Sequence, residues 1–186
     1  EMCIRDRGHA GYDCVTVDMQ HGLIGFETAA AMLQAISATP AQPLLRVRSN
    51  DPGLVMQALD AGAYGVICPL VNSAEEARRF SEACRYGPRG GRSFGPARGM
   101  LYGGPDYFDR ANDEVLALAM IETRGGVAEI DAILALPEID GVFVGPNDLC
   151  IEMGERPSSE PEAGTRAGTA IAHVLARSRA AGKIAG

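Results

Sequence analysis

The chain has 186 residues, 46% of them hydrophobic, and its 17 basic and 24 acidic residues give a formal charge of −7. This length is enough for one good-sized core, and the acidic balance argues against nucleic-acid binding, which normally needs a basic surface. No apolar run is long enough for a transmembrane helix, so we expect neither a nucleic acid nor a membrane as partner.

The alternation of apolar runs with helical patterns predicts repeated strand–helix units. In chain order we expect a strand at 12–18, a helix at 25–38, a strand at 42–48, a helix at 50–63, a strand at 64–70, a helix at 72–87, a strand at 114–123, a helix at 125–136, a strand at 139–146, a helix at 164–182 and the opening of another strand at 183–186. The glycine- and arginine-rich stretch 87–108 is too long for a plain connection, so we expect a functional segment or lid there, with a short strand near 92–95.

Repeated units of this kind predict a parallel sheet covered by helices. Two architectures compete, a doubly wound open sheet and a (β/α)8 barrel. No G-x-G-x-x-G follows a strand, so dinucleotide binding has no support. A complete barrel needs about 250 residues, so we predict an α/β fold of the (β/α)8 TIM-barrel type, incomplete, with about six of the eight strands.

The cysteine and lysine counts restrict the chemistry. The five cysteines are odd in number and form no C-x-x-C pair, which favours reduced thiols in a cytoplasmic protein over zinc or disulfides. Of the 17 basic residues only Lys183 is a lysine. A Schiff-base mechanism therefore has a single candidate, near the C-terminus, and is disfavoured.

Polar residues follow the predicted strands, where barrel enzymes carry their chemistry. They are Asp18 and His21, Arg46 and Arg48, Glu122, and Asp148. Two carboxylates from separate strands could share a hard divalent cation such as Mg²⁺ or Mn²⁺. An arginine would bind a substrate carboxylate through two hydrogen bonds, and a histidine would serve as a base near neutral pH.

Each of these residues also has a purely structural interpretation. His21 could be a loop histidine satisfied by Asp18, and Arg46 could be half of a structural ion pair. Asp148 could cap the following turn, and Asp60 could lie on a helix surface. Glu122 is harder to dismiss, because carboxylates are rarely buried without a partner.

Six segments, taken together and in order, resemble the HpcH/HpaI aldolases. They are "YDCVTVDMQHG", "PLLRVRSNDP", "ALDAGAYGVICPLVNSAEEA", "YGPRGGRSFGPARG", "MIETRGGVAEIDAIL" and "DGVFVGPNDL". Members are class II pyruvate aldolases such as 4-hydroxy-2-oxoheptanedioate aldolase and 2-dehydro-3-deoxyglucarate aldolase, which act in the catabolism of aromatic compounds or sugar acids. The resemblance implies a barrel that assembles as a homohexamer.

Carried over by position, the resemblance gives each candidate residue a role. The metal ligands fall on Glu122 and Asp148, with Mg²⁺, Mn²⁺ or Co²⁺ as the cofactor. The catalytic base falls on His21 and the aspartate that raises its basicity on Asp60. The arginine that stabilises the enolate falls on Arg46. The implied reaction is reversible cleavage of a 4-hydroxy-2-oxo acid to pyruvate and an aldehyde.

Three residues near these positions depart from the family pattern. Gln20 replaces a glutamate, Met120 stands where a substrate-binding glutamine is usual, and Asn147 replaces an alanine whose backbone touches the substrate. Met120 and Asn147 are therefore assigned with Arg46 and Asp148 to substrate binding. The departures concern the choice of aldehyde or acid more than the class of reaction.

The resemblance extends over 11–186, and residues 1–10 match no family segment, so we expect a leader foreign to the family at 1–10 and a partial barrel domain at 11–186. An incomplete barrel has unpaired sheet edges, so we expect the chain alone to be poorly stable and inactive. Two alternatives to the aldolase remain. One is a CoA-ester lyase of the citrate lyase β type, with Arg89 and Arg92 as phosphate-binding candidates. The other is an inactive remnant that still binds a 2-oxo acid.

Overall fold

A computed structural model of the protein describes residues 3–186; residues 1 and 2 of the predicted leader lie outside the described residues. One parallel sheet forms the centre of this part of the chain. Its strands are β1 (Cys14–Asp18), β2 (Gln42–Arg46), β3 (Gly65–Cys68), β4 (Leu116–Ile121), β5 (Gly141–Val144) and β6 (Ile184–Ala185). The strands predicted from apolar runs are therefore confirmed, with shorter bounds.

The order of the strands distinguishes the two competing architectures. The sheet runs β1-β2-β3-β4-β5-β6 and every neighbouring pair is parallel. A doubly wound sheet would reverse its strand order at a switch point, and no such reversal occurs among the described strands. The chain thus winds in one direction, as in a partial (β/α)8 barrel.

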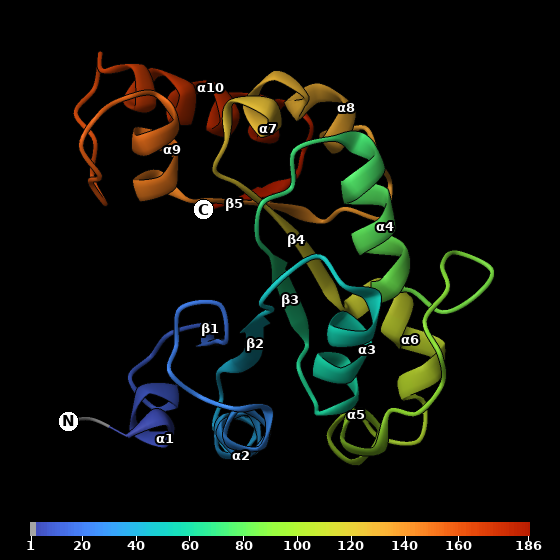
Figure 1. The fold of residues 1–186 in the computed structure, drawn as a ribbon. Coiled ribbons are helices and arrows are strands. Elements are labelled where there is room, and N and C mark those ends of the chain that lie inside the picture. The colour runs from blue at the N-terminus through green and yellow to red at the C-terminus, as the bar shows by residue number, and fades with distance from the viewer. Residues whose placement is uncertain (1–2) are drawn as a thin grey trace.

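Helices connect the strands and cover one face of the sheet. They are α1 (Ile4–Gly8), α2 (Phe26–Ser37), α3 (Pro52–Asp60), α4 (Ala74–Cys84), α5 (Ala97–Gly103), α6 (Tyr107–Glu114), α7 (Arg124–Ala128), α8 (Ile130–Leu134), α9 (Pro146–Glu152) and α10 (Arg166–Ala180). Figure 1 shows them in an arc around the strands, from α1 and α2 near the N-terminus to α10 near the C-terminus. This arc is the outer layer of a barrel.

Two apolar clusters occupy the two faces of the sheet, because successive strand residues point to opposite sides. The outer face, with Leu45 and Val66, packs with the helices into the main core. The inner face carries a smaller cluster of Leu44, Ile67, Leu118 and Met120. The inner face of β5 is less covered, since Phe143 is 38% exposed there. The apolar inner cluster thus lies just below the carboxyl edge of the strands.

Local capping explains where several helices begin. The Asp51 carboxylate accepts a hydrogen bond from the backbone of Gly53 at 2.8 Å, and Pro52 occupies the first turn of α3. The Ser73 hydroxyl accepts from Glu76 at the start of α4. Both helices therefore start within two residues of the position that the sequence predicts.

Three local predictions need correction. No strand forms near 92–95, and the long stretch instead contains α5 and α6. The helix predicted at 125–136 is divided into α7 and α8, with Glu129 between them in a non-helical conformation. Helix α9 is absent from the predicted elements, because a seven-residue helix is too short for apolar periodicity to mark it.

A buried ion-pair network lies toward the amino ends of the strands. The Arg85 side chain is 1% exposed and donates to the Glu138 carboxylate at 2.9 Å and to the Asp140 carboxylate at 2.6 Å. It also donates to the backbone oxygen of Val115 at 2.7 Å. These contacts join α4 to the segments that lead into β4 and β5.

No helix in the described part of the chain is long and apolar enough to cross a membrane. The five cysteines are all free in residues 3–186. Burial raises the pKa of Cys84 to about 12 and also raises the pKa of Cys68. These two thiols are therefore protonated at neutral pH.

Candidate active site

The parallel sheet places the carboxyl ends of its strands at one edge. Asp18 and Arg46 end β1 and β2 and are direct partners in the register. Glu122 follows β4, and Asp148 lies in α9, which follows β5. His21 follows the carboxyl end of β1. Four predicted site residues thus belong to the same edge of the sheet: His21, Arg46, Glu122 and Asp148.

Arg46 is fixed by a two-point ion pair with Asp18. Its Nε donates to Oδ1 at 2.8 Å and its Nη2 to Oδ2 at 2.5 Å. The hydrogen bond to Asp18 raises the pKa of Arg46, and the charges of Glu122 and Asp148 act in the same direction. Although burial opposes it, the hydrogen bonds from Arg46 and from the backbone of Gln20 lower the pKa of Asp18. The structural ion pair considered for Arg46 therefore exists, and it orients the guanidinium at the site.

His21 lies exposed on the turn that follows β1. Asp18 Oδ1 accepts from the backbone N–H of Gln20 at 2.9 Å and from that of His21 at 3.4 Å. A side chain at Gly22 would place its Cβ 2.0 Å from the Asp18 backbone oxygen, so only glycine fits there. Asp18 thus contacts the backbone of His21, and among the described residues the imidazole has no hydrogen-bond partner.

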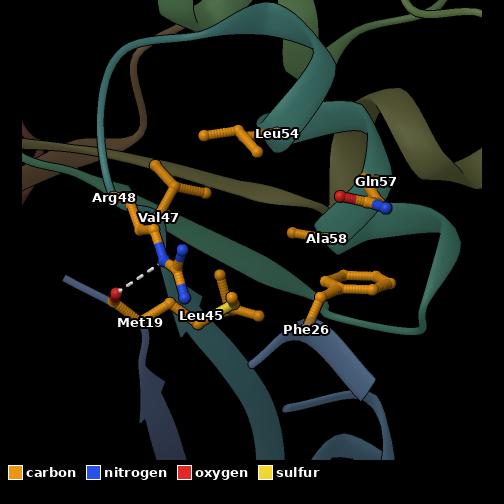
Figure 2. Close-up of a pocket in the computed structure, with 8 residues that line it drawn as sticks. All are labelled: Met19, Phe26, Leu45, Val47, Arg48, Leu54, Gln57 and Ala58. Carbon is orange, nitrogen blue, oxygen red and sulfur yellow. Dashed lines mark hydrogen bonds between the residues drawn. The ribbon is translucent and has the colours of Figure 1, made fainter. Parts of the chain in front are cut away.

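Arg48 holds both ends of the segment that contains His21. Its Nε donates to the Met19 backbone oxygen at 3.3 Å and its Nη2 to that of Ile24 at 2.9 Å. Figure 2 shows Arg48 beside Met19 at an apolar cavity of ≈ 100 Å³ that β2, α2 and α3 enclose. Neither Glu122 nor Asp148 lines this cavity. It belongs to the packing between the sheet and the helices.

Glu122 is 2% exposed, and its carboxylate is held from two sides. Its Oε1 accepts from the backbone N–H of Leu70 at 2.7 Å. On the other side, a Cβ built on Gly145 would lie 2.5 Å from Oε2, so the absence of a side chain there leaves room for the carboxylate. Among the described residues no donor reaches Oε2. One oxygen is therefore fixed and the other is free to bind a ligand.

Asp148 lies exposed in the first turn of α9, next to the exposed Asn147. The structural interpretation of Asp148 as a helix cap is wrong, because Gly145 occupies the N-cap position. Its carboxylate makes no side-chain hydrogen bond within residues 3–186. It is therefore available to a ligand at the carboxyl edge.

The charges at this edge influence one another. Burial raises the pKa of Glu122 above its ordinary value, and the charge of Asp148 adds to this effect. The hydrogen bond from Leu70 and the charges of Arg46 and His21 act in the opposite direction. Glu122 thus lies within electrostatic reach of Asp148, Arg46 and His21, which come from three other strand–helix units.

The two carboxylates suit a hard divalent cation that takes most of its ligands from water and substrate. Within residues 3–186, no group of three or more His, Cys, Asp or Glu side chains could hold a metal ion. Glu122 and Asp148 supply two carboxylates, and Mg²⁺ is typically bound by one or two carboxylates, with water and substrate completing the octahedron. Two open carboxylates are compatible with such a cation, and they leave positions for a substrate.

Asp60 is not brought to His21 within one chain. Asp60 ends α3, which leads into the amino end of β3, whereas His21 follows the carboxyl end of β1. The Asp60 carboxylate accepts from Arg92 at 3.1 Å. Asp60 is therefore a half-buried ion-pair partner and not the plain helix-surface residue of the structural interpretation.

The two arginines considered for phosphate binding are already engaged. Arg92 is buried, stacks on the ring of Tyr86 at 4.5 Å and donates to Tyr107 at 3.0 Å. Arg89 pairs with Glu138 and Asp113. Neither presents a free guanidinium to a nucleotide, so the structure gives no support to the CoA-ester lyase alternative.

Met120 is buried in the inner apolar cluster and lies below Arg46. Its sulfur accepts from Arg46 Nη1 at 3.9 Å. Sulfur is a weak acceptor, so this contact leaves the Nη1 hydrogens available. Met120 therefore touches the arginine without satisfying it.

Two contributions to the site are not evident from the sequence. The sequence suggests Asp18 as a partner of His21, whereas its pairing with Arg46 depends on the register of β1 and β2. Leu70 contributes through its backbone, and no side-chain chemistry could have indicated that role.

Comparisons with known proteins agree with this geometry. A family model described as HpcH/HpaI aldolase/citrate lyase matches residues 1–185. The chain is similar to a hydroxypyruvate/pyruvate aldolase of Rhizorhabdus wittichii, with 49% identity over 175 residues that cover 94% of this chain and 69% of that protein. It is similar to a 4-hydroxy-2-oxo-heptane-1,7-dioate aldolase of Salmonella dublin, with 39% identity, covering 95% and 67% of the two chains.

A solved structure gives the same result for the fold. The crystal structure of an HpcH/HpaI aldolase/citrate lyase family protein from Burkholderia cenocepacia J2315 superposes with a TM-score of 0.86 at 33% identity. The match covers 98% of this chain and 73% of that chain.

Proposed function

Because this chain belongs to the HpcH/HpaI aldolase/citrate lyase family, we propose that its site serves the cleavage of a 4-hydroxy-2-oxo acid into pyruvate and an aldehyde. The observation that carries the proposal is the convergence of Arg46, Glu122, Asp148 and His21 at one edge of the sheet, where their charges influence one another. A cation site, a fixed guanidinium and a base are the groups that this reaction requires.

Glu122 and Asp148 would hold a divalent cation, Mg²⁺, Mn²⁺ or Co²⁺. Glu122 offers its Oε2, because Oε1 already accepts from Leu70, and Asp148 offers an exposed carboxylate from α9. When bound there, the cation supplies Lewis acidity to the carboxylate and keto oxygens of a 2-oxo acid. The relatives named hydroxypyruvate/pyruvate aldolase and 4-hydroxy-2-oxo-heptane-1,7-dioate aldolase support this choice of substrate class.

Arg46 would stabilise the enolate of pyruvate. Its Nε and Nη2 are committed to Asp18, so the guanidinium plane is fixed before the substrate binds. Among the described residues its Nη1 meets only the weak sulfur acceptor of Met120, and it can donate to the oxygen on which negative charge develops. A preorganised donor of this kind stabilises the transition state more than the ground state.

His21 would act as the base of the cleavage. It takes the proton from the C4 hydroxyl while the C3–C4 bond breaks, the aldehyde forms at C4, and the bonding electrons pass to the enolate. Protonation of the enolate at C3 then gives pyruvate. The exposure of His21 suits a group that must reach an incoming hydroxyl, and the Asn147 backbone, next to Asp148 in α9, would contact the substrate.

A contribution of Asp60 to the basicity of His21 would require a second copy of the chain. Within one chain the two residues belong to opposite ends of the strands. An assembly of several copies, as the family resemblance implies, could bring Asp60 of one copy to His21 of another. This part of the proposal therefore includes a homo-oligomer.

The test is made in a protein in which the sequence of this chain is completed to a full barrel, because we expect the chain alone to be poorly stable and inactive. It combines Mn²⁺ binding, measured by calorimetry, with release of pyruvate from a panel of 4-hydroxy-2-oxo acids. We expect Glu122→Ala to lose both Mn²⁺ binding and turnover. His21→Ala should keep Mn²⁺ binding and lower kcat by roughly 10²–10⁴, the usual contribution of a general base.

Asp109→Asn removes an exposed carboxylate in α6 and serves as the matched control. Retained turnover in Glu122→Ala would refute the metal assignment. Metal-dependent binding of pyruvate by the parent chain without any cleavage would instead identify it as an inactive remnant that binds 2-oxo acids.

A further inference from the structure

Leu70 has an unusual backbone conformation directly beside the candidate metal ligands. Its φ is 54°, and it is the only non-glycine residue among 3–186 with a positive φ. This left-handed region is disfavoured for residues with a Cβ, and apart from glycine mainly asparagine and aspartate adopt it. The Leu70 side chain is 52% exposed, so side-chain packing offers little compensation.

The conformation gives the Leu70 peptide two specific contacts. Its N–H donates to Glu122 Oε1 at 2.7 Å, the only hydrogen bond to that carboxylate from the described residues. Its carbonyl oxygen accepts from Asn72 Nδ2 at 2.8 Å. Strain of this kind persists where the surroundings determine it, and it is concentrated at functional sites.

Asn72 ties the loop after β3 to the loop after β4. Its Oδ1 accepts a hydrogen bond from the hydroxyl of Thr123, the residue that follows Glu122. The Thr123 oxygen in turn accepts from the Gly126 backbone at 3.1 Å. The two loops are thus joined once through the Glu122 carboxylate and once through Thr123, which fixes Leu70 relative to Glu122.

From these contacts we infer that Leu70 is a positioning residue, whose left-handed backbone aims its N–H at Glu122 Oε1 and so leaves Oε2 directed at the cation. The inference rests on the proposed function for the role of Glu122. Gly145 completes the arrangement from the β5 side, because a side chain there would occupy the space of Oε2. The role depends on the backbone of Leu70 and not on its side chain.

Substitutions at position 70 can separate a backbone role from a side-chain role. Leu70→Ile keeps the size and polarity of the side chain, but its branched Cβ resists the left-handed conformation. Leu70→Asn loses the apolar side chain but tolerates that conformation. A backbone role predicts that Leu70→Ile is impaired and Leu70→Asn is not, whereas an apolar side-chain role predicts the reverse order.

The first readout is Mn²⁺ affinity by calorimetry. Partners that orient a metal ligand are typically worth 10–100-fold in affinity, so we expect Leu70→Ile to bind Mn²⁺ more weakly by about that factor. Leu70→Asn should stay close to the parent chain. Leu101→Ile, at a leucine that is 70% exposed in α5, is the matched control and should change nothing.

The second readout needs no metal. Hydrogen exchange of the amide at position 70, followed by NMR in metal-free protein, should be slow in the parent and in Leu70→Asn. It should be faster in Leu70→Ile and in Glu122→Ala, which removes the acceptor.

The two readouts test the positioning role of Leu70 and the proposed function of the site separately. Parent-like affinity and slow exchange in Leu70→Ile, with a loss in Leu70→Asn, would overturn the positioning role. The predicted order of exchange rates together with no Mn²⁺ binding by the parent chain would support the positioning of Glu122 and refute the proposed function.

Discussion

Gly145→Ala tests how closely β5 must approach Glu122. A Cβ at this position would lie 2.5 Å from Glu122 Oε2 and 2.7 Å from its Cβ, whereas ordinary contacts lie at 3.4–4 Å. The carboxylate can rotate away, but the Glu122 Cβ is fixed to the end of β4. The φ of Gly145 is −99°, which alanine adopts without strain, so the effect is steric.

The magnitude follows from the cost of overpacking, which is typically 1–3 kcal/mol. Because one clashing atom is held by the strand, we expect about 2–3 kcal/mol of lost stability. A domain of this size loses about 2–4 °C of Tm per kcal/mol, so Tm should fall by roughly 4–12 °C. Displacement of the carboxylate should also weaken Mn²⁺ binding by about 10–100-fold.

The assays are thermal unfolding of the metal-free chain and calorimetric titration with Mn²⁺. Gly91→Ala is the matched control, because a Cβ at Gly91 meets nothing within 4 Å, and it should stay within about 0.5 kcal/mol of the parent. If Gly145→Ala melts with the control and binds Mn²⁺ like the parent, the close approach of Gly145 does not shape the site.

Two further substitutions test the support around the site and the base of the sheet. Arg48→Met keeps the aliphatic stem but removes both hydrogen bonds to the segment that carries His21. We therefore expect kcat to fall several-fold while Mn²⁺ affinity is unchanged. A change in Mn²⁺ affinity with kcat intact would contradict the role of Arg48 in holding His21. Arg85→Met leaves two carboxylates without their buried partner. The free energy of unfolding, measured in urea, should fall by about 3 kcal/mol. This value is near the lower end for broken buried ion pairs, because the two carboxylates are partly exposed. The exposed Arg110→Met should destabilise the chain clearly less than Arg85→Met, because water screens its ion pairs; equal losses for the two arginines would show that burial of Arg85 is unimportant.

Asp60 illustrates the limit of assigning roles by position. The segment "ALDAG" ends a predicted helix that leads into a strand of a parallel sheet, which already places Asp60 near the amino ends of the strands, but no neighbouring residue indicates the partner of its carboxylate. The structure pairs it with Arg92, 32 residues away along the chain. Its predicted role at His21 therefore stays a prediction that concerns an assembly and not the single chain.

The alternation of strands and helices and the residue types at the strand ends can be predicted without any knowledge of the folded chain. These features depend on local periodicity, on capping residues such as Asp51, and on the chemistry of single side chains, all of which can be read from neighbouring positions. The near-absence of lysine likewise disfavours a Schiff-base mechanism on composition alone.

Which of these groups come into contact depends on how the strands pair in the folded chain. Arg46 meets Asp18 across 28 residues because β1 and β2 pair in one register, and Leu70 meets Glu122 across 52 residues because β3 and β4 are neighbours. The left-handed backbone of Leu70 is stabilised by these long-range contacts and runs against its own local preference. Local propensity is encoded by adjacent residues, whereas register, strain and the orientation of a carboxylate depend on segments that only folding brings together.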